Sequence, residues 1–160
     1  AYRRSFEEVA GFFKPDVIIT QNGADGHYYD PLTHLCLSME SYKQIPRLAH
    51  DIAHRMCGGK WIALGGGGYD MFRTVPRAWC LLWLEMNGWK CRPEQLPASW
   101  RRRWQLYSDA EMPYDWDDPE NMYEPIPRKK SINEKNRRTV DKALYPISGR
   151  EIGNRFPMIP

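Results

Sequence analysis

Apolar residues recur at helical spacing in three stretches of the first 90 positions. The first stretch covers residues 2–13 and closes before Pro15, because a proline disfavours helical geometry in the residue before it. The second runs from residue 42 to residue 56 and is followed by two glycines. The third begins at Thr74, the predicted N-cap, and ends at Gly88. The pattern therefore predicts three amphipathic helices.

Two short, continuous apolar runs, residues 17–19 and 61–64, separate these helices. Such a run is typical of a strand that is covered on both faces of a parallel sheet. The second helix joins the two runs, which makes a β-α-β unit with parallel strands and a right-handed crossover. The residues after each strand then emerge at one edge of the sheet, where α/β proteins place their ligand sites.

The chain changes character near residue 91. Most glycines lie before this point, and most prolines lie after it, where tryptophans are scattered among prolines and charged residues. We therefore expect a compact part, residues 1–90, followed by an irregular tail, residues 91–160. The tail is expected to wrap the domain through anchoring side chains, without a core of its own.

Composition excludes several classes of protein. The formal net charge is only +3, and the basic clusters of the tail are interleaved with acidic residues, which argues against a nucleic-acid partner. No apolar run approaches the roughly 20 residues that a membrane span requires, and the residues near position 1 do not have the apolar stretch of a signal peptide. No two cysteines form a C-x-x-C pair, as expected for reduced thiols. We expect a cytoplasmic protein; its cysteines are Cys36, Cys57, Cys80 and Cys91.

The loop after the first strand contains the sequence Gln-Asn-Gly-Ala-Asp at residues 21–25, and Asp30 and Leu32 complete it. A carboxylate at the end of a strand can reach a metal at the sheet edge, and glycines allow a tight turn beneath it. An aspartate in such a turn is also a common turn former. Local sequence leaves both readings of Asp25 open.

The loop after the second strand contains four glycines followed by a tyrosine, residues 65–69. The sequence fits neither G-x-x-x-x-G-K-[ST] nor G-x-G-x-x-G, which disfavours a phosphate-binding loop. The glycines instead allow a close backbone approach and deliver Tyr69 to the same edge as Asp25. A tyrosine that simply packs over a tight turn is the alternative.

Taken together, the two loops resemble those of the superfamily that contains histone deacetylases and the bacterial acetoin-utilisation proteins. The family's Gln-x-Gly-Ala-Asp motif matches residues 21–25, its Gly-Gly-Gly-Gly-Tyr motif matches residues 65–69, and its Arg-x-Trp signature matches residues 77–79. The resemblance extends from about residue 6 to residue 87. Residues 123–128 of the tail are similar to the acetoin-utilisation branch in particular.

The resemblance implies a three-layer α/β/α sandwich with a parallel sheet, of which this chain supplies the last strands. It also implies a metal-dependent deacetylase that hydrolyses the acetyl-lysine amide. Asp25 matches a ligand of the catalytic Zn²⁺, with Fe²⁺ as the other candidate, and Tyr69 matches the donor to the developing oxyanion. Residues matching the walls and floor of the substrate tunnel are Leu32, Gly67 and Gly68.

The chain contains no tandem His-His, and the family's Asp-x-His that supplies the other metal ligands lies upstream of the part represented here; residues 25–27 have that spacing but belong to the loop of the Gln-x-Gly-Ala-Asp motif. Both belong to the N-terminal half of the domain, so we expect that half as a partner and expect this fragment alone to be inactive. The implied substrate is an acetylated protein, such as acetyl-CoA synthetase. The alternative is a non-catalytic interaction module that uses the aromatic, proline-rich tail as its binding surface.

Four histidines need an interpretation. His50 and His54 form H-D-x-x-H, which differs from the zinc-protease signature H-E-x-x-H in its central acid, and we favour solvent-exposed helix residues. His27 and His34 lie in the loop of Asp25. They either border the mouth of the site or are ordinary surface residues.

Overall fold

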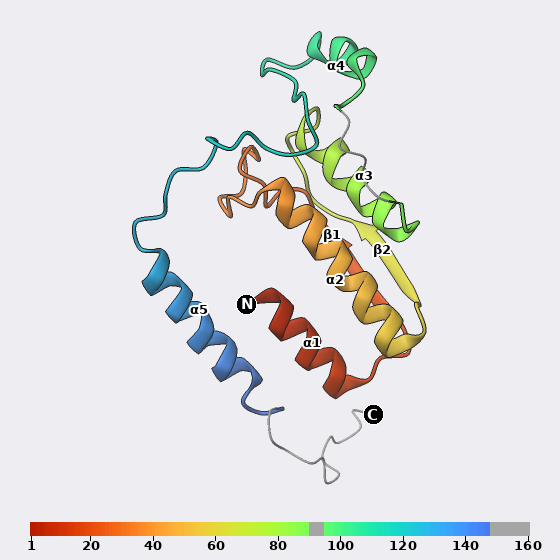
Figure 1. Ribbon diagram of the computed structural model, residues 1–160, viewed down its shortest axis with the longest axis vertical. Coiled ribbons are helices and arrows are strands. Elements are labelled where there is room, and N and C mark those ends of the chain that lie inside the picture. Colours follow the sequence, from red (N-terminus) through yellow and green to blue (C-terminus); the bar gives the residue numbers. More distant parts are fainter. Residues whose placement is uncertain (90–94, 148–160) are drawn as a thin grey trace. The chain divides into compact units, whose positions relative to one another are not determined.

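The computed structural model describes residues 1–89 and 95–147 (Figure 1). Contacts divide the chain into two compact units, Asp16–Glu124 and Ala1–Pro15 with the described part of Pro125–Pro160. Cys91 and the predicted boundary between residues 90 and 91 lie outside the described residues. The predicted division of the domain at that boundary stays a prediction.

Two parallel strands form the sheet of the larger unit. Strand β1 (Ile18–Asn22) pairs with β2 (Trp61–Gly65) in a register that runs from Ile18 opposite Trp61 to Asn22 opposite Gly65. Helix α2 (Met39–Cys57) joins them and ends at Gly58, whose φ of 62° is readily adopted only by a residue without a side chain. The predicted β-α-β unit with parallel strands is confirmed.

One face of this sheet is covered by α2. Trp61 on that face donates a hydrogen bond from Nε1 to Oγ1 of Thr20 at 2.8 Å, and the ring of His50 from α2 stacks on Trp61. The opposite face carries apolar side chains that are between 48% and 59% exposed: Ile19, Ile62 and Leu64. Within the described residues this second face is therefore uncovered, and coverage of both faces stays a prediction. A helix layer and a small parallel sheet are present, compatible with an α/β deacetylase fold.

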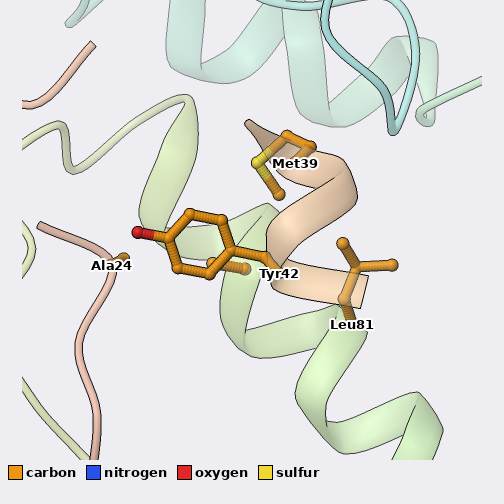
Figure 2. Close-up of a cluster of buried hydrophobic side chains, with 5 residues drawn as sticks. Ala24, Met39, Tyr42 and Leu81 are labelled. Atoms are coloured by element: carbon orange, nitrogen blue, oxygen red, sulfur yellow. The ribbon is translucent and has the colours of Figure 1, made fainter. Parts of the chain in front are cut away.

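Helix α3 (Thr74–Met86) packs against α2 and completes the core of this unit. Figure 2 shows Met39 and Tyr42 of α2 beside Leu81 of α3, with Ala24 from the loop after β1 in the same cluster. Burial of Tyr42 raises its pKa to about 12. The N-cap of α3 is residue 73 rather than the predicted Thr74. The cluster fixes the chain immediately before Asp25.

Residues 95–124 are not free of structure. Helix α4 (Ala98–Gln105) is followed by a loop whose Tyr114 carbonyl accepts a hydrogen bond from the Leu96 N–H at 2.8 Å. Leu96 and Met112 are 5% and 3% exposed. The prediction of an irregular tail is thus wrong for α4, and part of this segment contributes buried residues.

The smaller unit pairs α1 (Tyr2–Phe13) with α5 (Lys129–Leu144). Ala10, Val140 and Leu144 are its buried apolar residues, and Arg4 on α1 forms an ion pair with Asp141 on α5. Helix α1 confirms the first predicted helix, whereas α5 contradicts the expected irregular structure. No helix among the described residues combines the length and apolar character that a membrane span needs.

Candidate functional site

The carboxylate of Asp25 lies directly beside Gly67 in the loop that follows β2. A Cβ added to Gly67 would lie 2.6 Å from Oδ2 of Asp25, and one added to Gly23 would lie 2.5 Å from Oδ1. The N–H of Ala24 also donates to the Gly67 carbonyl at 2.6 Å. Because Gly23 and Gly67 have no side chain, the Asp25 carboxylate can occupy the space beside them. The prediction that the two loops meet at one sheet edge is confirmed.

The second contact between these loops joins Gly66 and Gly23. A Cβ on Gly66 would lie 2.7 Å from both the Cα and the N of Gly23, which are backbone atoms that cannot move aside alone. We expect Gly66→Ala to destabilise the protein by about 1–3 kcal/mol, because the added methyl overpacks this junction. Gly65→Ala is the matched control, since its Cβ would lie 3.4 Å from the Trp79 ring, an ordinary contact. Urea unfolding midpoints of both variants test the difference; equal midpoints would contradict it.

Tyr69 follows the glycines, and its side chain is 50% exposed. Its backbone N–H donates to Oδ2 of Asp30 at 2.9 Å. Leu32 is 62% exposed and donates its N–H to Oδ1 of the same carboxylate, also at 2.9 Å. A Cβ on Gly68 would lie 2.6 Å from Val75 of α3, so this glycine packs against the helix. Asp30 thus links the loop of Asp25 to that of Tyr69.

A cavity lies elsewhere in the same unit. It has a volume of about 710 Å³ and is bounded by Tyr29, Arg73, Arg77 and residues 111–119. None of the five predicted site residues lines it. Asp25 and Tyr69 lie on adjoining loops, and neither of them lines this cavity. Their predicted roles, with those of Leu32, Gly67 and Gly68, stay predictions.

Asp25 is the only predicted metal ligand in the chain. A carboxylate oxygen is an accepted ligand of zinc and of iron, so the chemistry of Asp25 fits one position of such a site. The described residues contain no group of three His, Cys, Asp or Glu side chains that could hold a metal ion. The remaining ligands would have to come from outside the described residues.

His27 is buried, so both sequence-based readings of this residue are wrong. Its Nδ1 accepts the N–H of Tyr29 at 3.1 Å, which leaves the proton on Nε2. Nε2 therefore donates to the Asp118 carboxylate, with distances of 3.1 and 3.2 Å to its oxygens. His34 is exposed, as a surface residue would be. The buried His27 therefore joins the Asp25 loop to Asp118 and does not border the mouth of the predicted site.

Asp118 also contacts both helices of the core. Its Oδ2 accepts the N–H of Met39, the first residue of α2, at 2.7 Å. Ser38 makes no side-chain capping bond, and the carboxylate of Asp118, 79 residues beyond Met39, caps α2 instead. Nη2 of Arg77 on α3, a residue 1% exposed, lies 3.4 Å from Oδ1. Burial raises the pKa of Asp118, but the hydrogen bonds from His27 and Met39 and the Arg77 charge outweigh it and lower the pKa overall.

The histidines of H-D-x-x-H do lie on one face of α2, but they face each other and α3. Nε2 of His54 is 3.0 Å from Nε2 of His50, whose Nδ1 is 2.8 Å from the Glu85 carboxylate of α3. Asp51, which would be the general base of a protease, is exposed. His50 therefore links α2 to α3 and is only partly exposed, in contrast to the predicted surface position, whereas His54 is exposed as predicted.

Residues 1–86, more than half of the chain, match the model of the histone deacetylase domain. The chain therefore belongs to the histone deacetylase family, which confirms the resemblance read from the two loops.

Within that family, the chain is similar to acetoin utilization proteins. It is 56% identical over 151 residues to AcuC of Bacillus subtilis (strain 168), an alignment that covers 94% of this chain and 39% of that protein. AcuC of Staphylococcus xylosus is 37% identical over 143 residues, covering 89% of this chain and 37% of its own length. AcuC of Staphylococcus aureus (strain N315) is 40% identical over 137 residues, covering 86% and 35%. The chain thus spans less than two-fifths of the length of these relatives.

Proposed function

We propose that this chain is the C-terminal part of a metal-dependent protein lysine deacetylase. The observation that carries the proposal is the contact between the Asp25 carboxylate and the glycine loop that ends in Tyr69. In metal-assisted hydrolysis of an amide, a carboxylate can hold the metal and a phenol can donate a hydrogen bond to the developing oxyanion. Membership of the histone deacetylase family supports the same reaction.

Each residue has a distinct role in this proposal. Asp25 binds the metal through its carboxylate, with Zn²⁺ as the expected ion and Fe²⁺ as the other candidate. A bound metal of this kind lowers the pKa of a water molecule and polarises the amide carbonyl. The Tyr69 hydroxyl donates a hydrogen bond to the oxygen on which negative charge develops, a contact worth most in the transition state. Leu32, Gly67 and Gly68 contact the stem of the acetylated lysine.

The remaining components come from the N-terminal half of the same domain. Ile19, Ile62 and Leu64 present an exposed apolar sheet face, which supports a third layer supplied by that half and hence the full α/β/α sandwich. The missing metal ligands and the proton-transfer histidines would arrive with it. The isolated chain is accordingly inactive. The substrate is an acetylated protein, for which acetyl-CoA synthetase is our candidate.

A binding module built on the tail is less well supported. Leu96 and Met112 are buried, and the Asp118 carboxylate holds α2, α3 and the Asp25 loop together. The Leu96 and Met112 side chains are therefore buried within their own unit and are not accessible to a partner.

The test is acetate release from an acetyl-lysine peptide by a protein that contains this chain together with the rest of the domain. We expect release to stop when a chelator removes the metal and to return when Zn²⁺ or Fe²⁺ is added. The chain alone, assayed in parallel, should release no acetate. Release that survives complete metal removal would contradict the proposed mechanism, and absence of release by the metal-loaded protein would end the proposed function.

A further inference from the structure

A buried carboxylate, that of Asp30, connects the two loops of the proposed site. Oδ1 accepts the N–H of Leu32 at 2.9 Å and that of Thr33 at 3.2 Å. Oδ2 accepts the N–H of Tyr69 at 2.9 Å. Asp30 is 5% exposed, so these bonds are shielded from competing water. One side chain thus fixes the backbone on both sides of the junction.

The charge on Asp30 is stabilised where it lies. Burial raises the pKa of its carboxyl group, but the backbone N–H groups of Leu32, Tyr69, Thr33 and Asp70 together outweigh this effect and lower the pKa. The carboxylate therefore remains ionised at neutral pH and accepts all of these bonds. Ionised acceptors make shorter and stronger hydrogen bonds than neutral ones, so the geometry is held firmly.

The position of the Tyr69 phenol depends on this backbone anchor. The Tyr69 side chain is half exposed, so packing within this chain holds only part of it, and the residues before it are glycines, which restrict the backbone least. The Ala24–Gly67 backbone bond joins the two loops before Tyr69, and the bond from the Tyr69 N–H to Asp30 fixes the backbone of Tyr69 itself.

We propose that Asp30 is a positioning residue for Tyr69, one that sets where the phenol lies relative to the metal ligand Asp25. This inference rests on the proposed function, because it assigns Asp30 a share in the same reaction. Asp30 does not touch the substrate or the metal. It acts through Tyr69, and displacement of a catalytic group by about 1 Å can lower the rate about 10²-fold.

The test is a double-mutant cycle in a protein that contains the whole domain. Asp30→Asn keeps the shape of the side chain but turns an N–H donor toward one of the backbone N–H groups. We expect it to lower kcat for acetyl-lysine hydrolysis by about 10- to 100-fold, with little change in KM. In a Tyr69→Phe background, the same substitution should lower kcat less than about 3-fold, because the hydroxyl that it displaces is already absent.

Two further measurements separate positioning from general damage. Metal content should be unchanged in Asp30→Asn, since Asp25 is retained. Asp118→Asn makes the same chemical change at another buried carboxylate that does not contact Tyr69, and its effect on kcat should be equal in both backgrounds. Equal fold-losses for Asp30→Asn with and without the Tyr69 hydroxyl would overturn the proposal, as would an unchanged kcat. A metal-loaded wild-type protein that releases no acetate would instead refute the proposed function itself.

Discussion

Tyr69→Phe, in a protein that contains the whole domain, is expected to lower kcat for acetyl-lysine hydrolysis by about 10²–10³-fold. The substitution removes one oxygen and leaves the ring, the backbone bond to Asp30 and the neighbouring glycines in place. Only a hydrogen bond to the developing oxyanion is lost, so KM should change little. Steady-state kinetics on an acetyl-lysine peptide measure both constants.

Asp25→Ala is the matched contrast, because it removes the proposed metal ligand from the neighbouring loop. Metal analysis should find the metal retained in Tyr69→Phe and lost from Asp25→Ala, with turnover low in both. Full activity in Tyr69→Phe would remove the oxyanion role. Metal retained at full occupancy in Asp25→Ala would show that this carboxylate is not a ligand.

Asp118→Ala is expected to destabilise the protein by about 3–5 kcal/mol. The substitution removes the carboxylate that forms an ion pair with the Arg77 guanidinium, a residue 1% exposed, and it removes the acceptor of the His27 and Met39 hydrogen bonds. A buried charge without a partner costs far more than a surface pair contributes. Guanidinium unfolding of the protein that contains this chain measures the loss.

Asp117→Ala provides the control one residue away. The Asp117 side chain is 60% exposed, and its ion pair with Lys43 lies at the surface, so the substitution should cost less than about 1 kcal/mol. Equal losses for the two variants would contradict the role assigned to Asp118.

The effect of Asp118→Ala should also depend on pH. Hydrogen bonds and the Arg77 charge hold the folded-state pKa of Asp118 below its ordinary value of 3.8. The stabilisation is therefore fully present above about pH 4 and is lost as the pH falls through the folded-state pKa. The gap between wild type and variant should shrink on acidification, and a gap that widened would contradict this assignment.

Local sequence signals were sufficient for the β-α-β unit and its loops. Pro15, Gly58 and Gly88 mark helix ends because each acts on the backbone at its own position. The parallel strands follow from the short apolar runs and the helix between them. Because parallel strands deliver their following residues to one edge, the meeting of the Asp25 and Tyr69 loops was also predictable.

Helices α4 and α5 were missed because prolines and charges dominate the composition around them. Helix α5 is polar over most of its surface and buries only Val140 and Leu144 among its residues. The sequence carries a weaker indication of this helix, because Glu134 and Arg138 are oppositely charged residues at i,i+4. They form an ion pair in the structure. Apolar periodicity alone does not detect a helix of this kind.

The role of His27 cannot be inferred from the residues near it in the sequence. The residue is buried because Asp118, 91 positions away, accepts its Nε2–H, and nothing near either residue indicates that pairing. Several acidic residues surround Asp118 in sequence, and only the fold distinguishes it from the exposed Asp117. Asp30 belongs to the loop that the sequence delimits, but its bond to the Tyr69 N–H follows only from the register of the two loops.

Because Asp118 caps α2, the position of Asp118 limits how much of the C-terminal part of this chain can be removed. The family match ends at residue 86, and a protein cut there would retain Asp25 and Tyr69. It would also remove the carboxylate that caps α2 and pairs with Arg77. A truncation that keeps these contacts therefore has to extend at least to Asp118, and one that also keeps the Tyr123 hydroxyl, 3.0 Å from Oδ2 of Asp118, has to extend to Tyr123.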